Sequence, residues 1–400
     1  MTPSGFRTKP IVIGMAGAGR ACELHANALH RVSAIPIRLK TVYARRQEQL
    51  DEAQRRFGFE YTTTDFEALL ADDEIDVIDI CTPPYLHQEQ ILQALKSGKH
   101  IICEKPFTGY FGDPKHPEEL CGRESKMVMY HKLKDDVAAL KQAVQGSERL
   151  FMYAENFVYA PAVAKVAEII TARRNRILFL RGEESLKGSS SPVAGLWSKT
   201  GGGTFMRTGT HPLAAALYLK SVEAAARGVS IEPISLIADM GTVTTTLSEH
   251  EHRHIAARPV DVEDNGTLVL EFSDKSKAVI LATDTCLGGS LNYVDVYCND
   301  ARFNCLLTLN NALSTYLLDQ DGMDNVYLSE MLPSPLGWNQ PFISDEMTRG
   351  YIDEMQDFME CVQQGRQPRS DLNLACSTAL ITYAAYASAE AGRRLYLKED

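Results

Sequence analysis

A run of β-branched residues that ends in clustered glycines is the feature that most constrains the fold of this chain. The segment reads IVIGMAGAGR over residues 11–20 and continues into a helical pattern of apolar residues. Glycine has no Cβ, so this turn lets a diphosphate approach the backbone, and the helix that follows points free N–H groups at the anion. Cys22 stands where the Gly-x-Gly-x-x-Gly pattern has its third glycine, so a glycine-rich turn without a ligand stays open as an alternative. The dinucleotide interpretation places these residues at the cofactor: Gly14, Gly17, Ala18, Gly19 and Arg20.

Strands and helices alternate after this turn. Apolar, β-branched runs predict strands near residues 39–43, 76–81, 100–103 and 150–153, and amphipathic spacing predicts helices between them. Such alternation predicts right-handed βαβ units on a parallel sheet, in which ligands bind beyond the carboxyl ends of the strands. The loops that start at residues 14, 44, 82 and 104 are therefore the candidate binding loops.

A set of motifs lies in these loops and further along the chain. They are Cys81-Thr82-Pro83-Pro84 with His87, Gly98-Lys99-His100, Glu104-Lys105-Pro106, Asn156 to Pro161, Gly201-Gly202-Gly203 with Gly209-x-His211, and the run from Tyr383 to Leu397. Together they resemble the Gfo/Idh/MocA family of nicotinamide-dependent oxidoreductases, and Glu-Lys-Pro at a strand end is the most specific of them. The resemblance covers nearly the whole chain. It implies an N-terminal Rossmann domain followed by an α+β domain with an open, mostly antiparallel sheet.

The length of the chain predicts two domains, because 400 residues exceed what one core usually organises. We expect a Rossmann dinucleotide-binding domain over residues 1–155 and a substrate-binding and oligomerisation domain over residues 156–400, which makes the fold class α/β. Strand-like runs in the second part lie at 177–180, 234–238, 267–272, 278–282 and 293–297, and the last two suggest an antiparallel pair. The C-terminal helix is expected to pack back toward the first domain. A polar insertion over residues 109–130 either covers the active site or is a surface excursion.

Composition and charge restrict the class of protein. Hydrophobic residues make up 44% of the chain, yet no apolar run reaches the length of a membrane span, and the N-terminus lacks the layout of a signal peptide. The net charge of −11 without a basic tract argues against nucleic-acid binding. Nine scattered cysteines fit a reducing compartment better than a disulfide framework. We expect a cytoplasmic protein with a small carbohydrate-like substrate, assembled as a homodimer or homotetramer through the sheet of the second domain.

Two residues are candidates for proton transfer. Oxidation of an alcohol requires a base for the hydroxyl proton while hydride leaves the same carbon for a nicotinamide. The resemblance assigns this proton chemistry to Lys105 and gives Glu104 the role of steadying the nicotinamide ribose. His211 follows a glycine-rich segment, and it can serve as the general base because an imidazole titrates near neutrality. A solvated surface lysine and a capping or core histidine are the alternatives.

Arg207 departs from the family pattern. The family commonly carries an aspartate four residues before the histidine, and here that residue is Arg207, on the same helical face as His211. A guanidinium is no base but binds an anion in a bidentate fork. Arg207 therefore either recognises an anionic substrate, which we favour slightly, or pairs with an acid such as Glu155, Glu183 or Glu184. The predicted substrate-binding set also includes Asn156, Tyr159, Glu183 and Trp197, and the predicted cofactor-binding set also includes Thr82, Pro83, His87, Glu104 and Lys105.

The end of the second predicted strand bears on the choice of cofactor. It reads Tyr43-Ala44-Arg45-Arg46 and carries no acid for the adenosine ribose of NAD. Arg45 and Arg46 suit the 2′-phosphate of NADP, so NAD(P) is the predicted cofactor, with NADP slightly favoured and NAD open. Surface charges at a helix N-terminus are the alternative.

Three histidines alternate with charged residues in the segment EHEHRH, residues 249–254. In a strand, His250, His252 and His254 would share one face and could bind zinc. Because no cysteine or other fourth ligand is close in sequence, a solvated loop is the favoured interpretation and no metal is predicted.

These observations predict an NAD(P)-dependent oxidoreductase that acts on a secondary hydroxyl of a sugar, polyol or sugar acid. Within the same family resemblance lies an NAD-dependent glycosidase, which oxidises its substrate transiently and eliminates the aglycone with a tightly bound cofactor. A non-catalytic sensor that keeps the dinucleotide fold is a third class. The presence of Lys105 and His211 argues against the sensor.

Overall fold

The fold divides into two compact units. The structure is a computed structural model, and it describes residues 9–397 except 114, 117–118, 309–312, 322, 324–333, 335 and 341–344. The first unit comprises Met1–Tyr110, His131–Tyr159 and Gly350–Leu380, and the second comprises Phe111–Tyr130, Ala160–Arg349 and Ile381–Asp400. Residues 350–380, which the sequence assigns to the second domain, thus group with the first unit, and most of the insertion 109–130 groups with the second.

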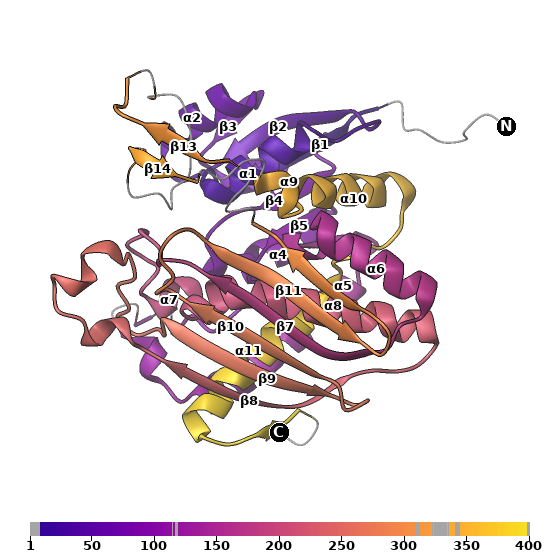
Figure 1. Ribbon diagram of the computed structural model, residues 1–400. Helices are drawn as coiled ribbons and strands as arrows, with labels where there is room; N and C mark the ends of the chain where they lie inside the picture. The colour runs from indigo at the N-terminus through magenta and orange to yellow at the C-terminus, as the bar shows by residue number, and fades with distance from the viewer. Residues whose placement is uncertain are drawn as a thin grey trace. The chain divides into compact units, whose positions relative to one another are not determined.

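A parallel sheet of six strands forms the first unit (Figure 1). Its order is β3-β2-β1-β4-β5-β6, with the crossover at β1 that a doubly wound sheet requires. The strands are β1 (Ile11–Ala16), β2 (Ile37–Tyr43), β3 (Tyr61–Thr63), β4 (Val77–Ile80), β5 (His100–Glu104) and β6 (Phe151–Ala154). Sequence analysis did not predict β3, because three residues without an apolar run leave no periodic signal.

Helices of the first unit follow the expected amphipathic spacing. In α2 (Gln47–Phe57), Leu50, Ala53 and Phe57 are buried on one face, and Gly58 ends the helix in the left-handed conformation at φ 72°. The α10 helix (Tyr351–Gln364) packs on α1 (Arg20–Leu29), which is why residues so distant in sequence belong to this unit. The unit also contains α3 (Phe66–Leu70), α4 (His87–Lys96) and most of α5 (Lys126–Gln145).

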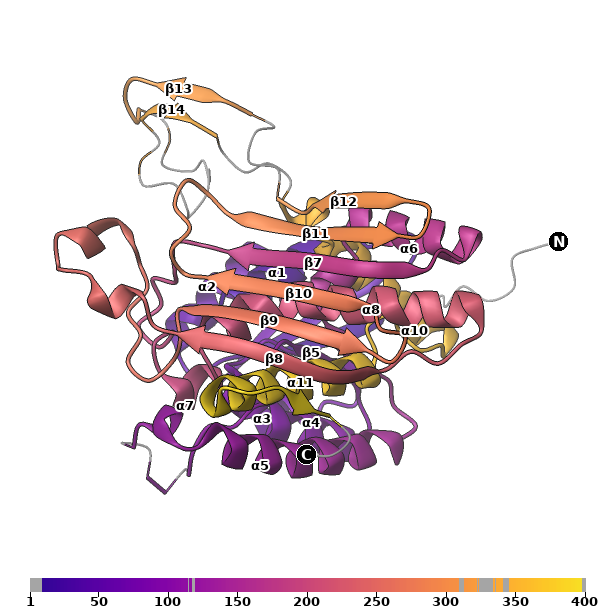
Figure 2. The same cartoon turned by 60° about the horizontal axis from the view of Figure 1, so that its bottom comes forward.

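The second unit is built on a sheet of seven strands, in the order β12-β11-β7-β10-β9-β8-β15 (Figure 2). Its strands are β7 (Ile177–Ser185), β8 (Pro233–Gly241), β9 (Asn265–Phe272), β10 (Lys277–Thr283), β11 (Leu291–Cys298), β12 (Arg302–Leu306) and β15 (Leu395–Tyr396). All neighbours are antiparallel except β7 and β10. The predicted α/β fold class and mostly antiparallel second sheet are confirmed. The predicted pairing of β10 with β11 is wrong, because β7 lies between them.

Helices α6 (Pro161–Arg173) and α8 (Thr210–Arg227) cover one face of this sheet (Figure 2). Close approach of α8 to β7 depends on Gly182, because a Cβ there would lie 2.7 Å from the Cβ of Pro212. The unit also contains α7 (Trp197–Thr200), α9 (Asp345–Thr348), the hairpin of β13 (Thr315–Leu317) and β14 (Gly337–Asn339), and the later part of α11 (Leu372–Ala391). None of the described helices combines the length and apolarity needed to cross a membrane.

Candidate functional site

Two glycines shape the turn between β1 and α1. Gly17 has φ +110°, and a Cβ there would lie 2.5 Å from the carbonyl oxygen of Cys81, so only glycine fits. A Cβ on Gly19 would meet nothing within 4 Å, and Gly19 is the N-cap of α1. This open backbone at a helix N-terminus fits the diphosphate of a dinucleotide.

Other residues of the predicted loop have local roles in the structure. Gly14 lies inside β1, where a Cβ would contact the side chains of Ile75 and Leu69, so its smallness serves packing. Arg20 pairs with Glu23 on the same helix at 2.7 Å. Cys22 is fully buried, which raises the pKa of its thiol to about 12 and leaves it a small apolar side chain at the position of the third glycine.

Arg45 and Arg46 follow β2 and are exposed. Among the described residues neither forms an ion pair, whereas Arg56 on α2, the helix that follows them, pairs with Glu23 and Glu52. Two uncompensated guanidinium groups at the carboxyl end of a strand suit a phosphate group.

The loops after β4 and β5 are joined by a buried histidine. His87 has its Nδ1 at 2.8 Å from the carbonyl oxygen of Pro106 and its Nε2 at 2.8 Å from that of Thr82. His87 therefore lies between the two loops and contacts a backbone carbonyl of each. Burial lowers its pKa, and the neutral ring donates a hydrogen bond to one of the two carbonyls. The Thr82 hydroxyl donates to Gln90 at 2.5 Å, and Pro83 is exposed beside it.

Glu104 is the last residue of β5, and its carboxylate contacts Lys105 and His25. Its Oε2 accepts a hydrogen bond from the Lys105 backbone N–H at 2.8 Å, and its Oε1 lies 3.3 Å from Nε2 of His25. His25 belongs to α1 and is completely buried, with its Nδ1 3.0 Å from both carboxylate oxygens of Asp79 in β4. The sequence analysis missed His25 and Asp79, although an aspartate inside the apolar strand Val77–Ile80 is a detectable signal of a buried partner.

His25 and Asp79, together with Cys81, are the one group of described residues whose donor atoms could hold a metal ion, all within 4.8 Å of one another. The Cys81 Sγ lies 3.4 Å from Nδ1 of His25, and burial raises the pKa of this thiol well above its ordinary value. A metal ligand would be the thiolate, and the spacings are those of hydrogen bonds. We therefore interpret the group as a hydrogen-bonded cluster.

In the second unit, His211 lies near the start of α8 and is buried. Its Nε2 is 3.8 Å from Oε2 of Glu184 in β7, and Oε1 of Glu184 accepts from the Arg349 guanidinium at 2.9 Å. The helix before it is irregular, because residues Phe205–Gly209 form a π-helical turn, a feature frequently found at functional sites.

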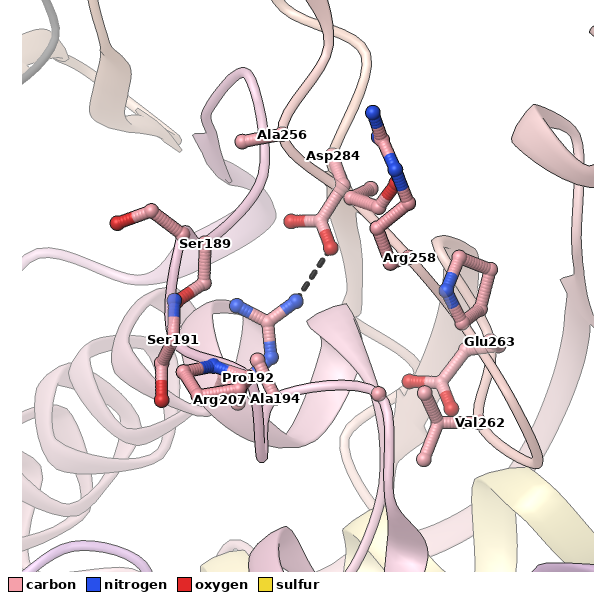
Figure 3. Close-up of a pocket in the computed structure, with 14 residues that line it drawn as sticks. Ser189, Ser191, Pro192, Ala194, Arg207, Ala256, Arg258, Val262, Glu263 and Asp284 are labelled. Carbon is pink, nitrogen blue, oxygen red and sulfur yellow. Dashed lines mark hydrogen bonds and ion pairs between the residues drawn. The ribbon is translucent and has the colours of Figure 1, made fainter. Parts of the chain in front are cut away.

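Arg207 lies on this π-helical turn and lines a pocket of about 90 Å³ (Figure 3). Its guanidinium forms an ion pair with Asp284, which follows β10 and is buried. Burial raises the pKa of Asp284, and the nearby Arg207 opposes that rise. Asp284 is thus an acid that pairs with Arg207 and that the sequence did not suggest. The remaining polar lining comes from Ser189, Ser190, Ser191, Arg258 and Glu263.

Glu263 anchors the start of the π-helical turn. Its carboxylate accepts from the backbone N–H groups of Gly203 at 2.8 Å and Phe205 at 2.9 Å, and from the Tyr386 hydroxyl at 2.8 Å. Burial raises the pKa of Glu263 to about 7, although these hydrogen bonds favour the ionised form. Sequence analysis did not single out this residue, because its partners lie about 60 and 120 positions away in the chain.

Four residues predicted to bind substrate lie in packed surroundings. The Tyr159 hydroxyl donates to Asp357 at 2.9 Å and accepts from the Ser370 N–H at 3.0 Å. Trp197 packs against Tyr383 and Tyr386, and Asn156 is 2% exposed. The Glu183 carboxylate accepts from Ser185 and Tyr293. Their direct contact with substrate stays a prediction.

The histidine-rich segment forms no strand. Residues Glu251–His254 form a short 3-10 helix, so the three histidines do not share the face that a strand would give them. The Nε2 of His252 lies 2.7 Å from the carbonyl oxygen of Ala257, and His250 contacts Arg253. These contacts give the segment a local structural role.

Comparisons with known proteins agree with the geometry of the first unit. Residues 11–132 match the family model GFO_IDH_MocA, described as an oxidoreductase family with an NAD-binding Rossmann fold. The chain is 27% identical over 373 residues to the levoglucosan dehydrogenase of Pseudarthrobacter phenanthrenivorans. The aligned region covers 88% of this chain and 89% of that protein. The resemblance inferred from the motifs is therefore confirmed.

Solved structures share the fold over nearly the full length. GenD2 from gentamicin A biosynthesis, in complex with NAD, has a TM-score of 0.74 at 20% identity and covers 99% of both chains. Levoglucosan dehydrogenase in complex with NADH and levoglucosan has a TM-score of 0.71 at 23% identity, covering 98% of this chain and 100% of that chain. At these identities the likeness shows the fold.

Proposed function

We propose that this chain, whose residues 11–132 match the GFO_IDH_MocA family model, is an NAD(P)-dependent dehydrogenase that oxidises a secondary hydroxyl of a neutral sugar or polyol. The observation that carries this proposal is the open backbone at Gly19, at the N-terminus of α1, in a chain whose relatives are named as sugar dehydrogenases. The nicotinamide supplies the acceptor for the hydride when it is bound.

The residues of the first unit hold the cofactor in this proposal. The backbone of Gly17 to Gly19 and the first turn of α1 bind the diphosphate. Arg45 and Arg46 bind the adenosine end, and they favour NADP through its 2′-phosphate. Glu104 and Lys105 lie at the end of β5, where a parallel sheet places its ligands.

Proton chemistry falls to Lys105 and His211. The Nζ of Lys105 polarises the substrate hydroxyl or carries its proton, as the family resemblance implies. His211 can take a proton on its imidazole, and the carboxylate of Glu184 at 3.8 Å stabilises the imidazolium that results.

The pocket around Arg207 supports a neutral substrate. An ion pair of Arg207 with Asp284 offers hydrogen-bond donors and acceptors side by side, which matches neighbouring hydroxyls of a polyol. An anionic substrate would have to compete with Asp284 for the same guanidinium. This weighs against the slight preference for anion recognition that the sequence suggests.

A substrate screen tests the proposed function. We expect NADH or NADPH absorbance to appear with levoglucosan, myo-inositol or a D-glucoside, measured side by side with NAD and NADP. Equal or faster reaction with NAD would remove the role given to Arg45 and Arg46. Cleavage of an aryl glycoside without added cofactor, and without net reduction of nicotinamide, would replace the dehydrogenase by the glycosidase.

Variants at the Arg207–Asp284 pair test the substrate pocket. Arg207→Ala leaves a buried carboxylate without its cation, so we expect a fall in melting temperature from a loss on the order of 3 kcal/mol. The double variant Arg207→Ala/Asp284→Asn should recover the melting temperature. We expect KM for a neutral polyol to stay raised about tenfold in the double variant, because the hydrogen bonds to substrate are lost. Recovery of KM together with stability would give the pair a purely structural role.

A further inference from the structure

A histidine and several carboxyl groups are buried together beneath the binding loops of the first unit. His25 lies on α1, Asp79 in β4, Glu104 at the end of β5 and Glu354 on α10. The side chains of His25 and Asp79 are completely buried, and that of Glu104 is 12% exposed. The proton chemistry proposed above uses neither His25, Asp79 nor Glu354.

Both ring nitrogens of His25 face carboxylates. Nδ1 lies 3.0 Å from each oxygen of Asp79, and Nε2 lies 3.3 Å from Oε1 of Glu104. The Nδ1 contact is a hydrogen bond, whereas Nε2 lies at ion-pair distance from Glu104 and has no hydrogen-bond partner among the described residues. A neutral imidazole carries one N–H, so only the doubly protonated ring presents an N–H and a positive charge to both carboxylates. An imidazolium between two carboxylates also offsets the cost of burying their charges.

The electrostatics of the surrounding groups agree with this assignment. Burial alone would lower the pKa of His25, but the carboxylate of Asp79, and after it the contact with Cys81, raise it well above its ordinary value. Burial alone would raise the pKa of Glu104, yet His25 and Lys105 lower it. Glu104 is therefore ionised, and His25 is the cation beside it.

The other groups that face His25 carry no compensating charge. Burial raises the pKa of Glu354 well above its ordinary value, and neither of its carboxyl oxygens has a hydrogen-bond partner among the described residues, so we assign it as protonated. Burial likewise raises the pKa of the thiols of Cys22 and Cys81, which remain neutral. His25 is thus the cation of a cluster with two ionised carboxylates.

The cluster reaches the surface at one point. Oε2 of Glu104 accepts from the Lys105 N–H at 2.8 Å, so a chain of contacts runs from Asp79 through His25 and Glu104 to the backbone of Lys105. If Glu104 lost its cation, the buried carboxylate would take up a proton. The acceptor for the Lys105 N–H would then weaken, and a displacement of even 1 Å at a reacting group costs about 100-fold in rate.

We propose that His25 is a positioning residue, which as a buried imidazolium between Asp79 and Glu104 keeps Glu104 ionised and directed at the backbone of Lys105. The role of Lys105 rests on the proposed function, whereas the charge of His25 does not. The two parts are therefore tested by separate measurements.

The first measurement needs neither cofactor nor substrate. In protein labelled with ¹³C at histidine Cε1, we expect the His25 signal, assigned from its loss in His25→Gln, to remain that of an imidazolium well above the ordinary pKa of histidine. In Asp79→Asn the same signal should titrate at a lower pH than in the wild-type protein. A His25 signal that titrates near its ordinary pKa in the wild-type protein would overturn the proposal, even if the dehydrogenase assignment is correct.

The second measurement follows the dissociation constant of NADH by fluorescence as a function of pH. In His25→Gln, the ratio of this constant to that of the wild-type protein should grow about tenfold as the pH falls from about 8 to about 6, because Glu104 now takes up a proton. The double variant His25→Gln/Glu104→Gln should give a ratio that does not change with pH, because the titrating carboxyl is gone.

His30, the C-cap of α1, provides the control. It is exposed and bonds to the carbonyl oxygen of Phe57 at 2.9 Å, so His30→Gln should leave the NADH ratio near one at every pH. Equal weakening at all pH values in both His25→Gln and the double variant would make His25 a merely structural residue and overturn the proposal. Absence of NADH binding by the wild-type protein would contradict the proposed function, while the NMR titration would still decide the charge of His25.

Discussion

At Gly19 a valine side chain would enter the space in which the loop meets the diphosphate. Because no protein atom lies within 4 Å of a Cβ there, Gly19→Val should leave the fold and its melting temperature nearly unchanged. We expect its affinity for NADH, measured by calorimetry, to fall at least about 100-fold, since the branched side chain blocks the anion from the backbone. Gly241→Val is the control, because Gly241 also has open space but lies at the end of β8 in the second unit. Wild-type affinity in Gly19→Val would contradict the dinucleotide site.

Lys105 and His211 should affect turnover more than cofactor binding. Lys105→Met and His211→Asn each remove a group that can hold a proton, so we expect kcat to fall about 100-fold or more with the substrate found in the screen. The dissociation constant of NADH should change little in either variant. Near-normal turnover in one variant would remove that residue from the mechanism and leave the other in place.

At the residue scale, the sequence predicts best where chemistry requires one residue type. Gly17 is detectable because a Cβ there would clash with the backbone of Cys81, and Gly19 because the motif keeps the backbone at the helix N-terminus open for an anion. The partner of Arg207 was beyond reach, because Asp284 is 77 residues away and comes close only through the register of β10. Asp79 is an intermediate case. Its place in an apolar strand indicates a buried charge, but it does not indicate that His25 is the partner.

The π-helical turn before α8 depends on one carboxyl group. The pKa of Glu263 rises from its ordinary value of 4.5 to about 7 because the group is buried, so the folded state binds a proton more tightly than the unfolded state. The contribution of Glu263 to the free energy of unfolding therefore falls as the pH rises from about 4.5 to about 7, by roughly 3 kcal/mol. Glu263→Gln cannot ionise, so its melting temperature relative to the wild-type protein should rise across this range.

Glu251→Gln provides a control of opposite sign. Hydrogen bonds from Ser248 lower the pKa of Glu251, so the ionised form stabilises the folded state above the ordinary pKa. The relative melting temperature of Glu251→Gln should thus stay level or fall with rising pH. A parallel response of the two variants would show that burial of Glu263 does not govern its titration.

Helices and strands were predictable where the apolar pattern of the sequence extends over many neighbouring residues. The βαβ alternation and the start of α6 at Pro161 follow from spacing and proline chemistry. The position of β7 between β10 and β11 does not, because strand order in an antiparallel sheet is set by contacts between segments about 100 residues apart. The residues 249–254 illustrate the same limit, because the alternation of histidines imitates a strand while local hydrogen bonds form a 3-10 helix.

At the scale of the molecule, nothing in the local sequence predicts that residues 350–380 belong to the first unit. The apolar face of α10, with Met355 and Phe358 fully buried, would suit either unit equally well. The packing of α10 on α1 and its contacts with Tyr159 place it in the first unit, and the packing on α1 also brings Glu354 beside His25. Long-range contacts of this kind explain why the cluster beneath the cofactor loops was not foreseen.

The outer face of the seven-stranded sheet is the basis of the last prediction, a homodimer or homotetramer formed through the second unit. Ile237, Val269 and Val279 lie opposite one another across β8, β9 and β10, and Ile237 is 39% exposed. An exposed apolar stripe on a sheet is commonly covered by a second copy in a symmetric assembly. We expect light scattering to give two or four times the chain mass of 44.3 kDa.

Val279→Lys should shift this mass toward one chain, because a lysine at the centre of the face would place an unpaired charge in the interface. Val229→Lys is the matched control, since Val229 is 44% exposed but lies in the turn after α8, away from the sheet. A monomeric wild-type protein would contradict the assembly itself. An unchanged mass in Val279→Lys would show that the interface lies on another surface, because a charge is not tolerated at the centre of a packed apolar contact.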